Sequence, residues 1–106
     1  MRMWNIDPRK MCNQHLLGEH FEIHKMIGNL RHSRTWAESL TKKGFLEPQN
    51  ALTRHNKLVR EMLKRKIKHK SPLNVKKVDL PQGKVDVKKS KKDLIKRCKN
   101  CRRLLK

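Results

Sequence analysis

Residues 13–30, NQHLLGEHFEIHKMIGNL, place apolar side chains at the spacing of one face of an α-helix. On a helical wheel this apolar face covers roughly 60° of arc. His15 and Glu22 fall together on its neighbouring edge, about a quarter-turn away. A carboxylate at such an edge is partly desolvated and still meets a substrate, so Glu22 is a candidate site residue. The apolar face consists of Cys12, Leu16, Ile23, Ile27 and Leu30.

Helix start signals recur along the chain. Asp7 and Pro8 have the residue types of an N-cap and a first helical position. Thr35 and Glu38 match a capping box. We therefore predict an all-α fold: a compact single domain of three main helices plus a short helix, with an irregular basic segment before the last helix. The predicted helices span residues 8–31, 36–43, 48–66 and 87–105, and the irregular segment spans residues 69–84.

Two of these helices have a predicted inward face. The short helix is expected to bury Trp36 and Leu40. The helix over residues 48–66 is expected to turn its basic residues, Arg54 among them, away from the core. Its predicted apolar stripe consists of Leu52, His55, Val59, Met62 and Leu63.

Gly18 lies four residues before Glu22, about one helical turn away. A glycine inside a helix costs about 1 kcal/mol relative to alanine. Two explanations remain open. Gly18 either leaves room beside the Glu22 carboxylate for a chain end or a sugar, or it lets two helices pack closely.

The chain carries 29 lysine and arginine residues against 9 acidic ones, a formal net charge of +20. Residues 1–47 hold 8 basic and 5 acidic side chains, whereas residues 48–106 hold 21 and 4. Such an excess predicts a polyanionic partner, and contacts to phosphates would release the counterions of DNA. We expect a single domain over residues 1–106, with a catalytic half at 1–47 and a strongly basic DNA-binding half at 48–106.

The sequence disfavours a membrane or an oxidising compartment. No apolar run approaches the ~20 residues of a membrane span, and no signal-peptide core is present. Three cysteines, an odd number, favour a reducing compartment over a disulfide framework. The expected location is cytoplasmic and nucleoid-associated, without a membrane partner.

The α-amino group of Met1 is a second candidate reactive group. Its pKa near 7.7–8 leaves roughly one-tenth of it as free base at pH 7, far more than for a lysine. Arg2 is bulky, so the initiator methionine is expected to remain. Such an amine is a ready nucleophile for imine chemistry. Because every protein has an N-terminus, this group gains meaning only beside a partner such as Glu22.

Histidines and cysteines raise the question of a metal site. His20 and His24 are one helical turn apart, Cys12 precedes them, and Cys98-x-x-Cys101 is a common half-site for zinc. However, a second CxxC and the HExxH order are both missing, and cysteines within a helix are more often packing residues. We therefore predict no metal ion and no other cofactor.

The block from Gln14 to Ile23, QHLLGEHFEI, resembles the pyrimidine-dimer DNA glycosylase/abasic-site lyases of the phage endonuclease V type. The resemblance continues through Lys25 to Gly28 and resumes over residues 58–65, LVREMLKR. The opening MRMWNIDPRKMC, the HKSPL near the middle and the ending DLIKRCKNCRR resemble a compact prokaryotic branch of that family. Together these segments touch most of the chain.

The resemblance implies a function and a set of site residues. The catalytic glutamate of the family falls on Glu22 and its N-terminal nucleophile on Met1. The implied reaction is excision of UV-type pyrimidine dimers from double-stranded damaged DNA, followed by β-elimination at the abasic site through a Schiff base. The enzyme is expected to act as a monomer and without a cofactor. DNA contacts are expected from Arg2, His15, Phe21, Lys25, Arg31, Lys64 and Arg65.

Two departures from the phage-type pattern bear on specificity. Phe21 stands where those enzymes have arginine, so one phosphate or base contact is missing or replaced by stacking. Their aromatic-rich ending, which is thought to help hold the dimer, is replaced by RCKNCRRLLK. The resemblance therefore implies the reaction chemistry more directly than it implies a preference for pyrimidine dimers.

Two other classes of protein fit parts of the sequence. The net charge alone suits a non-enzymatic nucleic-acid binder of the ribosomal or nucleoid type. The CxxC pair suits a small zinc-dependent binding module. Neither class explains a QHLLGEH-x-E block near a reactive amine, so the glycosylase/lyase is the preferred prediction.

Overall fold

The computed structural model describes residues 2–32, 35–69, 72–76 and 78–105. Every regular element in these ranges is a helix, which confirms the predicted all-α class. Between residues 66 and 86 the described part of the chain is irregular, as predicted. Two short 3₁₀ helices, η1 (Pro8–Lys10) and η2 (Pro48–Asn50), precede α1 and α3. The α-helices are α1 (Asn13–His32), α2 (Thr35–Lys42), α3 (Ala51–Lys64), α4 (Val87–Arg97) and α5 (Lys99–Leu105).

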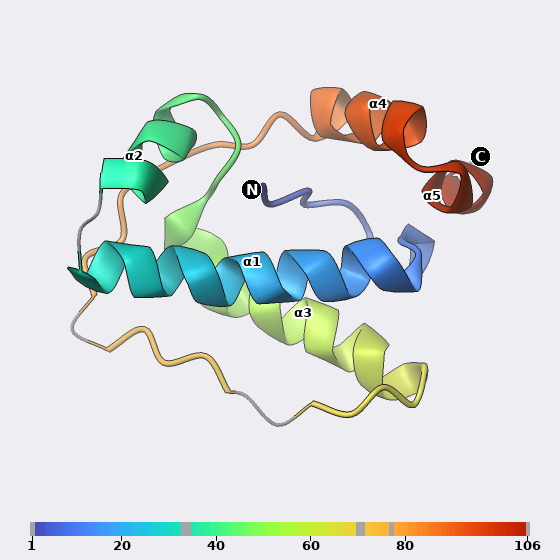
Figure 1. The fold of residues 1–106 in the computed structure, drawn as a ribbon, viewed down its shortest axis with the longest axis horizontal. Helices are drawn as coiled ribbons and strands as arrows, with labels where there is room; N and C mark the ends of the chain where they lie inside the picture. Colours follow the sequence, from blue (N-terminus) through green and yellow to red (C-terminus); the bar gives the residue numbers. More distant parts are fainter. Residues whose placement is uncertain (1, 33–34, 70–71, 77, 106) are drawn as a thin grey trace.

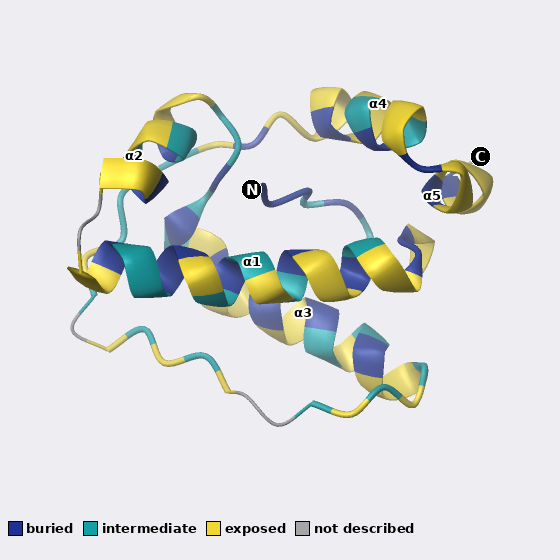
Figure 2. Cartoon of the chain, in the orientation of Figure 1, coloured by how far each residue is buried: buried dark blue, intermediate teal, exposed yellow. Residues whose placement is uncertain are grey.

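Helix α1 is the long central element, and the other helices are arranged around it (Figure 1). Both α2 and α3 pack on α1, while α4 and α5 pack on each other and α5 contacts η1. Within the described ranges, no helix combines the length and the apolar character needed to cross a membrane. Figure 2 shows the buried face of α1, formed by Leu16, Glu19, Ile23, Met26, Ile27 and Leu30.

The N-terminal segment, residues 2–6, lies in the interior between α1 and α4 (Figure 1). The backbone amide of Met3 donates to the carbonyl of Phe45 at 2.8 Å. The hydroxyl of Ser90, on α4, donates to the carbonyl of Trp4 at 2.6 Å. The start of the described chain is therefore fixed among the helices.

Two of the predicted helices are interrupted, each next to a cysteine. The predicted first helix consists of η1, capped by the side chain of Asp7, and of α1. Between them, Met11 takes an extended backbone (φ −104°, ψ 142°) and its side chain is fully buried. The predicted last helix is divided into α4 and α5 at Cys98, which is also extended (φ −134°, ψ 116°) and buried. At both breaks the extended residue, Met11 or Cys98, buries its side chain in the interior.

Three side chains predicted to face the core lie at the surface instead. Trp36 is 40% exposed, Leu52 41% and Leu63 59%. The buried face of α3 is rotated from the predicted stripe because this helix buries Arg54, which pairs with Glu19 of α1. The predicted inward positions of Leu40, His55 and Met62 are confirmed. The buried residues of α3 are Ala51, Arg54, His55, Leu58 and Met62.

Candidate active site

A pocket of about 340 Å³ opens between the N-terminal segment, the first half of α1 and the end of α4. It brings together Arg2, His15 and Glu22, three of the residues predicted from the sequence. It also contains Arg97, a cation from α4. The complete lining is Arg2, Trp4, Gln14, His15, Gly18, Glu19, Glu22 and Arg97.

Glu22 is the available carboxylate of this pocket. Its side chain is half-buried and makes no hydrogen bond or ion pair with any residue that the structure describes. The other carboxylate in the lining, Glu19, is fully engaged by Arg54. Glu22 is therefore the acid that can act on a bound molecule.

Gly18 keeps the space beside Glu22 open. A Cβ atom built on Gly18 would meet no atom within 4 Å, although the residue lines the pocket. Close packing of two helices would have produced short contacts at this position. Of the two explanations left open by the sequence, the structure supports room beside the carboxylate.

This geometry predicts a gain in fold stability for one substitution of Gly18 and a loss of activity for another. Gly18→Ala should stabilise the fold by about 0.5–1 kcal/mol, because alanine is the better helix former and its methyl group meets nothing. Gly18→Leu should fill the pocket and lower the DNA cleavage that the sequence resemblance implies by roughly 10²-fold relative to Gly18→Ala, because the reacting groups are displaced. Urea unfolding and single-turnover cleavage of damaged duplex DNA measure the two effects. Equal cleavage by both variants would contradict an active site at this pocket.

Arg2 supplies a buried positive charge to the pocket. Its Nη1 donates to Asp93 Oδ2 of α4 at 2.9 Å, and this contact with Arg2 holds the pKa of Asp93 below its usual range. The guanidinium also lies over the Trp4 ring, 4.6 Å from its centroid, and over the Phe45 ring at 4.9 Å. Arg2 Nε is buried and has no hydrogen-bond partner among the described residues. One donor of Arg2 therefore remains for a bound anion or oxygen atom.

Glu19 and Arg54 form a buried, bidentate ion pair next to the pocket. Arg54 Nε donates to Glu19 Oε2 at 2.5 Å and Arg54 Nη2 to Glu19 Oε1 at 2.9 Å. Both side chains are almost completely inaccessible. The pair fixes α3 against α1 directly behind the helix turn that carries Glu22.

His15 forms the boundary between the pocket and a cluster of cysteines. Its Nδ1 lies 3.2 Å from the sulfur of Cys12, and its ring meets Trp4 edge to face at 6.0 Å between centroids. Burial lowers the pKa of His15, and the positive charge of Arg97 lowers it further. Both effects favour the neutral form of the imidazole.

Phe21, Lys25 and Lys64, which are predicted to contact DNA, have exposed side chains. Phe21 is 60% exposed, and the Nζ atom of Lys25 lies 4.9 Å from its ring centroid on the surface of α1. Lys64 lies beside Arg60 and Lys57 in a shallow groove of about 220 Å³ along α3. Contact of these three side chains with DNA stays a prediction.

Two other predicted DNA contacts are occupied by the protein itself. Arg31 donates to the backbone carbonyl of Asn74 at 2.9 Å. Arg65 donates to Glu61 at 2.8 Å and to Asn13 Oδ1 at 2.9 Å, which ties the end of α3 to the start of α1. Neither side chain lines the pocket, and contact with DNA stays a prediction for both.

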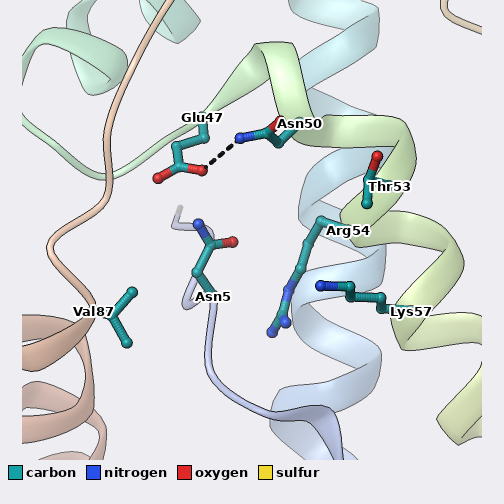
Figure 3. Close-up of a pocket in the computed structure, with 7 residues that line it drawn as sticks. All are labelled: Asn5, Glu47, Asn50, Thr53, Arg54, Lys57 and Val87. Atoms are coloured by element: carbon teal, nitrogen blue, oxygen red, sulfur yellow. Dashed lines mark hydrogen bonds between the residues drawn. The ribbon is translucent and has the colours of Figure 1, made fainter.

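A larger hollow of about 440 Å³ is lined by residues of the N-terminal segment, η2, α3 and the start of α4 (Figure 3). Its only acid among the lining residues, Glu47, accepts from Asn50 Nδ2 at 3.0 Å and from the amide of Val85 at 2.7 Å. Figure 3 shows Arg54 and Lys57 reaching toward this space from α3. With its carboxylate engaged, the hollow offers no free acid for catalysis.

Two clusters of metal-ligand side chains occur in the described chain, and neither was predicted as such. The sequence suggested one set built from the cysteines with His20 and His24, whereas the structure separates them. In each cluster the four ligand atoms lie within 4.8 Å of one another. The pKa of His20 is lowered to about 4, by burial first and then by the neighbouring histidines. The clusters are Cys12, His15, Cys98 and Cys101, and separately His20, His24, His55 and His69.

Sequence reasoning missed Arg97 and the role of Arg54. Arg97 reaches the pocket only because α4 packs over the N-terminal segment, and no local pattern indicates such a contact. Arg54 was predicted to face away from the core, like the other basic residues of its helix. Its position one helical turn before the buried Leu58 was the available signal.

Met1, the predicted nucleophile, lies outside the described residues, whereas Arg2, bonded to it, lines the pocket. In a comparison with protein families, the model for pyrimidine dimer DNA glycosylase matches residues 1–75. No curated protein and no solved structure matches the chain. The matched range contains Glu22 and ends before α4, so Arg97, Cys98 and Cys101 lie beyond it.

Proposed function

The chain belongs to the pyrimidine dimer DNA glycosylase family, and from this premise we propose that it both excises the damaged base and cleaves the strand. The substrate would be a UV-type pyrimidine dimer in double-stranded DNA, and the product of the second step a nick 3′ to the abasic site. The observation that carries the proposal is the Glu22 carboxylate, which has no polar partner among the described residues, in a pocket that Arg2, the neighbour of Met1, also lines.

The Met1 α-amino group is the proposed nucleophile. As free base it attacks C1′ of the damaged nucleotide, so that an N–C1′ bond forms while the glycosidic bond breaks and the base takes the electron pair and a proton. In a cyclobutane dimer the released base stays joined to the neighbouring pyrimidine through the cyclobutane ring. Ring opening of the sugar gives the Schiff base. Removal of a C2′ proton expels the 3′ phosphate, and water then releases the enzyme.

Glu22 is the proposed acid–base group of both steps. Its negative charge would stabilise the positive charge that develops on the sugar as the base departs. It would then accept the C2′ proton in the elimination. Among the described residues its carboxylate has no hydrogen-bond or ion-pair partner, which supports this role. The unsatisfied Nε of Arg2 and the cation of Arg97 would hold the flanking phosphate.

The basic surface supplies the binding energy for the duplex. Lys25 and Lys64 would contact phosphates directly, and Phe21 would stack on a base or sugar exposed at the lesion. Arg31 would exchange its carbonyl partner for phosphate, and Arg65 would exchange its carboxylate and amide partners. Reaching C1′ requires local distortion of the duplex, and a poorly stacked dimer makes that distortion easier.

Borohydride trapping tests this function. The protein with its native N-terminus is incubated with duplex DNA that contains one abasic site or one cyclobutane dimer, and sodium borohydride is added. We expect a covalent protein–DNA adduct and, without borohydride, strand cleavage at the lesion. Binding to both duplexes with neither adduct nor cleavage would favour the second candidate, a non-enzymatic nucleic-acid binder, which the net charge alone also supports.

A further inference from the structure

The cysteine cluster has the composition and spacing of a zinc site. Two half-sites, Cys12-x-x-His15 and Cys98-x-x-Cys101, come from opposite ends of the chain and meet in the interior. The sulfurs of Cys12 and Cys98 are 3.7 Å apart, far beyond the ~2.05 Å of a disulfide. All three cysteines are free and buried. A second half-site, which the sequence appeared to lack, is provided by Cys12 and His15.

The distances fit tetrahedral coordination. With Zn–S of ≈ 2.3 Å and Zn–N of ≈ 2.0–2.1 Å, neighbouring ligand atoms in a tetrahedron are roughly 3.5–3.8 Å apart. Cys12 Sγ lies 3.7 Å from Cys98 Sγ and 3.2 Å from His15 Nδ1. Both distances are close to the spacing expected for ligands of one ion, and all four ligand atoms lie within 4.8 Å of one another.

The backbone around the cluster is arranged for thiolate ligands. The amide of Cys12 donates to the sulfur of Cys101 at 3.3 Å, and the amide of Cys101 donates to the sulfur of Cys98 at 3.5 Å. Backbone amides that donate to a sulfur in this way stabilise it as a metal ligand. Three thiolates with one Zn²⁺ carry a net charge of −1, which Arg97 and Lys99, on either side of Cys98, would offset.

We propose that Cys12, His15, Cys98 and Cys101 bind one zinc ion in a closed, structural site. The ion joins the start of α1 to the junction of α4 and α5, and so fixes the helix that supplies Arg97 to the pocket. His15 then uses Nδ1 for the metal and keeps its Nε2 hydrogen for the pocket. A chain with only 35% hydrophobic residues gains stability from such a link, as other small domains do.

The four-histidine cluster is a second candidate metal site, and a separate observation supports it. His20 and His24 of α1, His55 of α3 and His69 of the irregular segment surround one point. The Nε2 atoms of His20 and His69 are buried and have no hydrogen-bond partner in the described chain. Buried ring nitrogens without a partner are rare, and a metal ion would satisfy them.

The geometry of the four imidazoles also fits a tetrahedral ion. At Zn–N of ≈ 2.0–2.1 Å, neighbouring Nε2 atoms would be about 3.3 Å apart and ring centres roughly 5 Å apart. The Nε2 atoms of His24 and His55 are 3.2 Å apart, and ring centroids of His20, His24 and His55 lie 4.8–5.0 Å from one another. His55 Nδ1 lies 3.1 Å from Asn56 Oδ1, an outer partner typical of metal-bound histidine. We infer that this cluster binds a second divalent ion, also zinc.

Metal content and cobalt spectroscopy test both sites. The untagged protein is produced in zinc-supplemented medium, purified with a reducing agent, dialysed and measured by elemental analysis. We expect about two zinc ions per chain. After replacement by Co²⁺, the cysteine site should give thiolate-to-cobalt charge-transfer bands in the near ultraviolet, whereas a four-histidine site gives none. Wild-type protein that holds no zinc, even after reconstitution with Zn²⁺ under reducing conditions, would overturn both inferences.

Substitutions separate the two sites. Cys101→Ser should lower the zinc content to about one and remove the charge-transfer bands, whereas His20→Gln should lower the content to about one and keep them. His32→Gln, the one histidine outside both clusters, is the matched control and should keep both ions. If Cys101→Ser fails to fold, a thiol-specific mercurial added to wild-type protein should release one ion. Full zinc content in a folded variant, or no release by the mercurial, would refute the corresponding site.

Discussion

Glu22→Gln is expected to lower cleavage of abasic-site and dimer-containing DNA by about 10²–10⁴-fold while DNA binding is retained. Glutamine keeps the shape and volume of glutamate but has no negative charge and cannot accept the C2′ proton. Because Glu22 makes no hydrogen bond or ion pair with another described residue, its replacement should leave the fold intact. Single-turnover cleavage and a binding titration with the same oligonucleotide separate the two effects.

Glu38→Gln is the matched control for Glu22→Gln. It removes one carboxylate from α2, a helix that does not line the pocket, and so changes the net charge by the same amount. The control should cleave DNA like the wild type. Equal cleavage by Glu22→Gln and Glu38→Gln would remove Glu22 from the mechanism.

Arg54→Ala is expected to destabilise the fold by about 3–5 kcal/mol, because it leaves the buried carboxylate of Glu19 without its partner. Both oxygens of Glu19 accept from Arg54, and the two side chains are nearly inaccessible to water. The loss is a large part of the stability of a domain of this size. Urea unfolding, followed by circular dichroism at 222 nm in the α-helix range, measures it.

Two further variants show whether the cost comes from the unpaired charge. Arg60→Ala removes an exposed arginine from the same helix and should change the free energy of unfolding by less than about 0.5 kcal/mol. Adding Glu19→Gln to Arg54→Ala should recover part of the loss, because no buried charge then remains. A cost below about 1 kcal/mol for Arg54→Ala would mean that water reaches Glu19.

The local spacing of apolar residues was sufficient to predict the all-α class and the amphipathic character of α1. The apolar spacing of Leu16, Ile23 and Ile27 predicted its buried face, and Glu22 lies at the edge of that face, in the pocket. Both features depend on residues within a few helical turns of one another. For the same reason, Gly18 could be linked to Glu22 before the structure was known.

Features that depend on distant contacts could not be predicted in this way. The breaks at Met11 and Cys98 follow from the meeting of the two chain ends, 86 residues apart at Cys12 and Cys98. The face of α3 follows from the pairing of Arg54 with Glu19, which no spacing rule indicates. In a chain with so many basic residues, no feature of the sequence distinguishes the buried Arg54 from the exposed arginines.

The metal sites illustrate the same limit. Neither half-site predicts a metal ion when it is considered alone. Zinc coordination was indicated only when the structure placed Cys12 and His15 beside Cys98 and Cys101. If zinc holds α4 in place, it also holds Arg97 in the pocket. Loss of the ion would then weaken DNA cleavage without any change in Glu22.

The identity of the reacting amine is the most direct test of the proposed chemistry. The borohydride-trapped adduct on abasic DNA is digested with protease and nuclease, and the modified peptide is sequenced by mass spectrometry. We predict that the sugar remnant is attached to the α-amino group of Met1, and that protein acetylated only at this amine forms no adduct. A remnant on a lysine side chain, or an undiminished adduct from the acetylated protein, would contradict catalysis by the Met1 amine and Glu22.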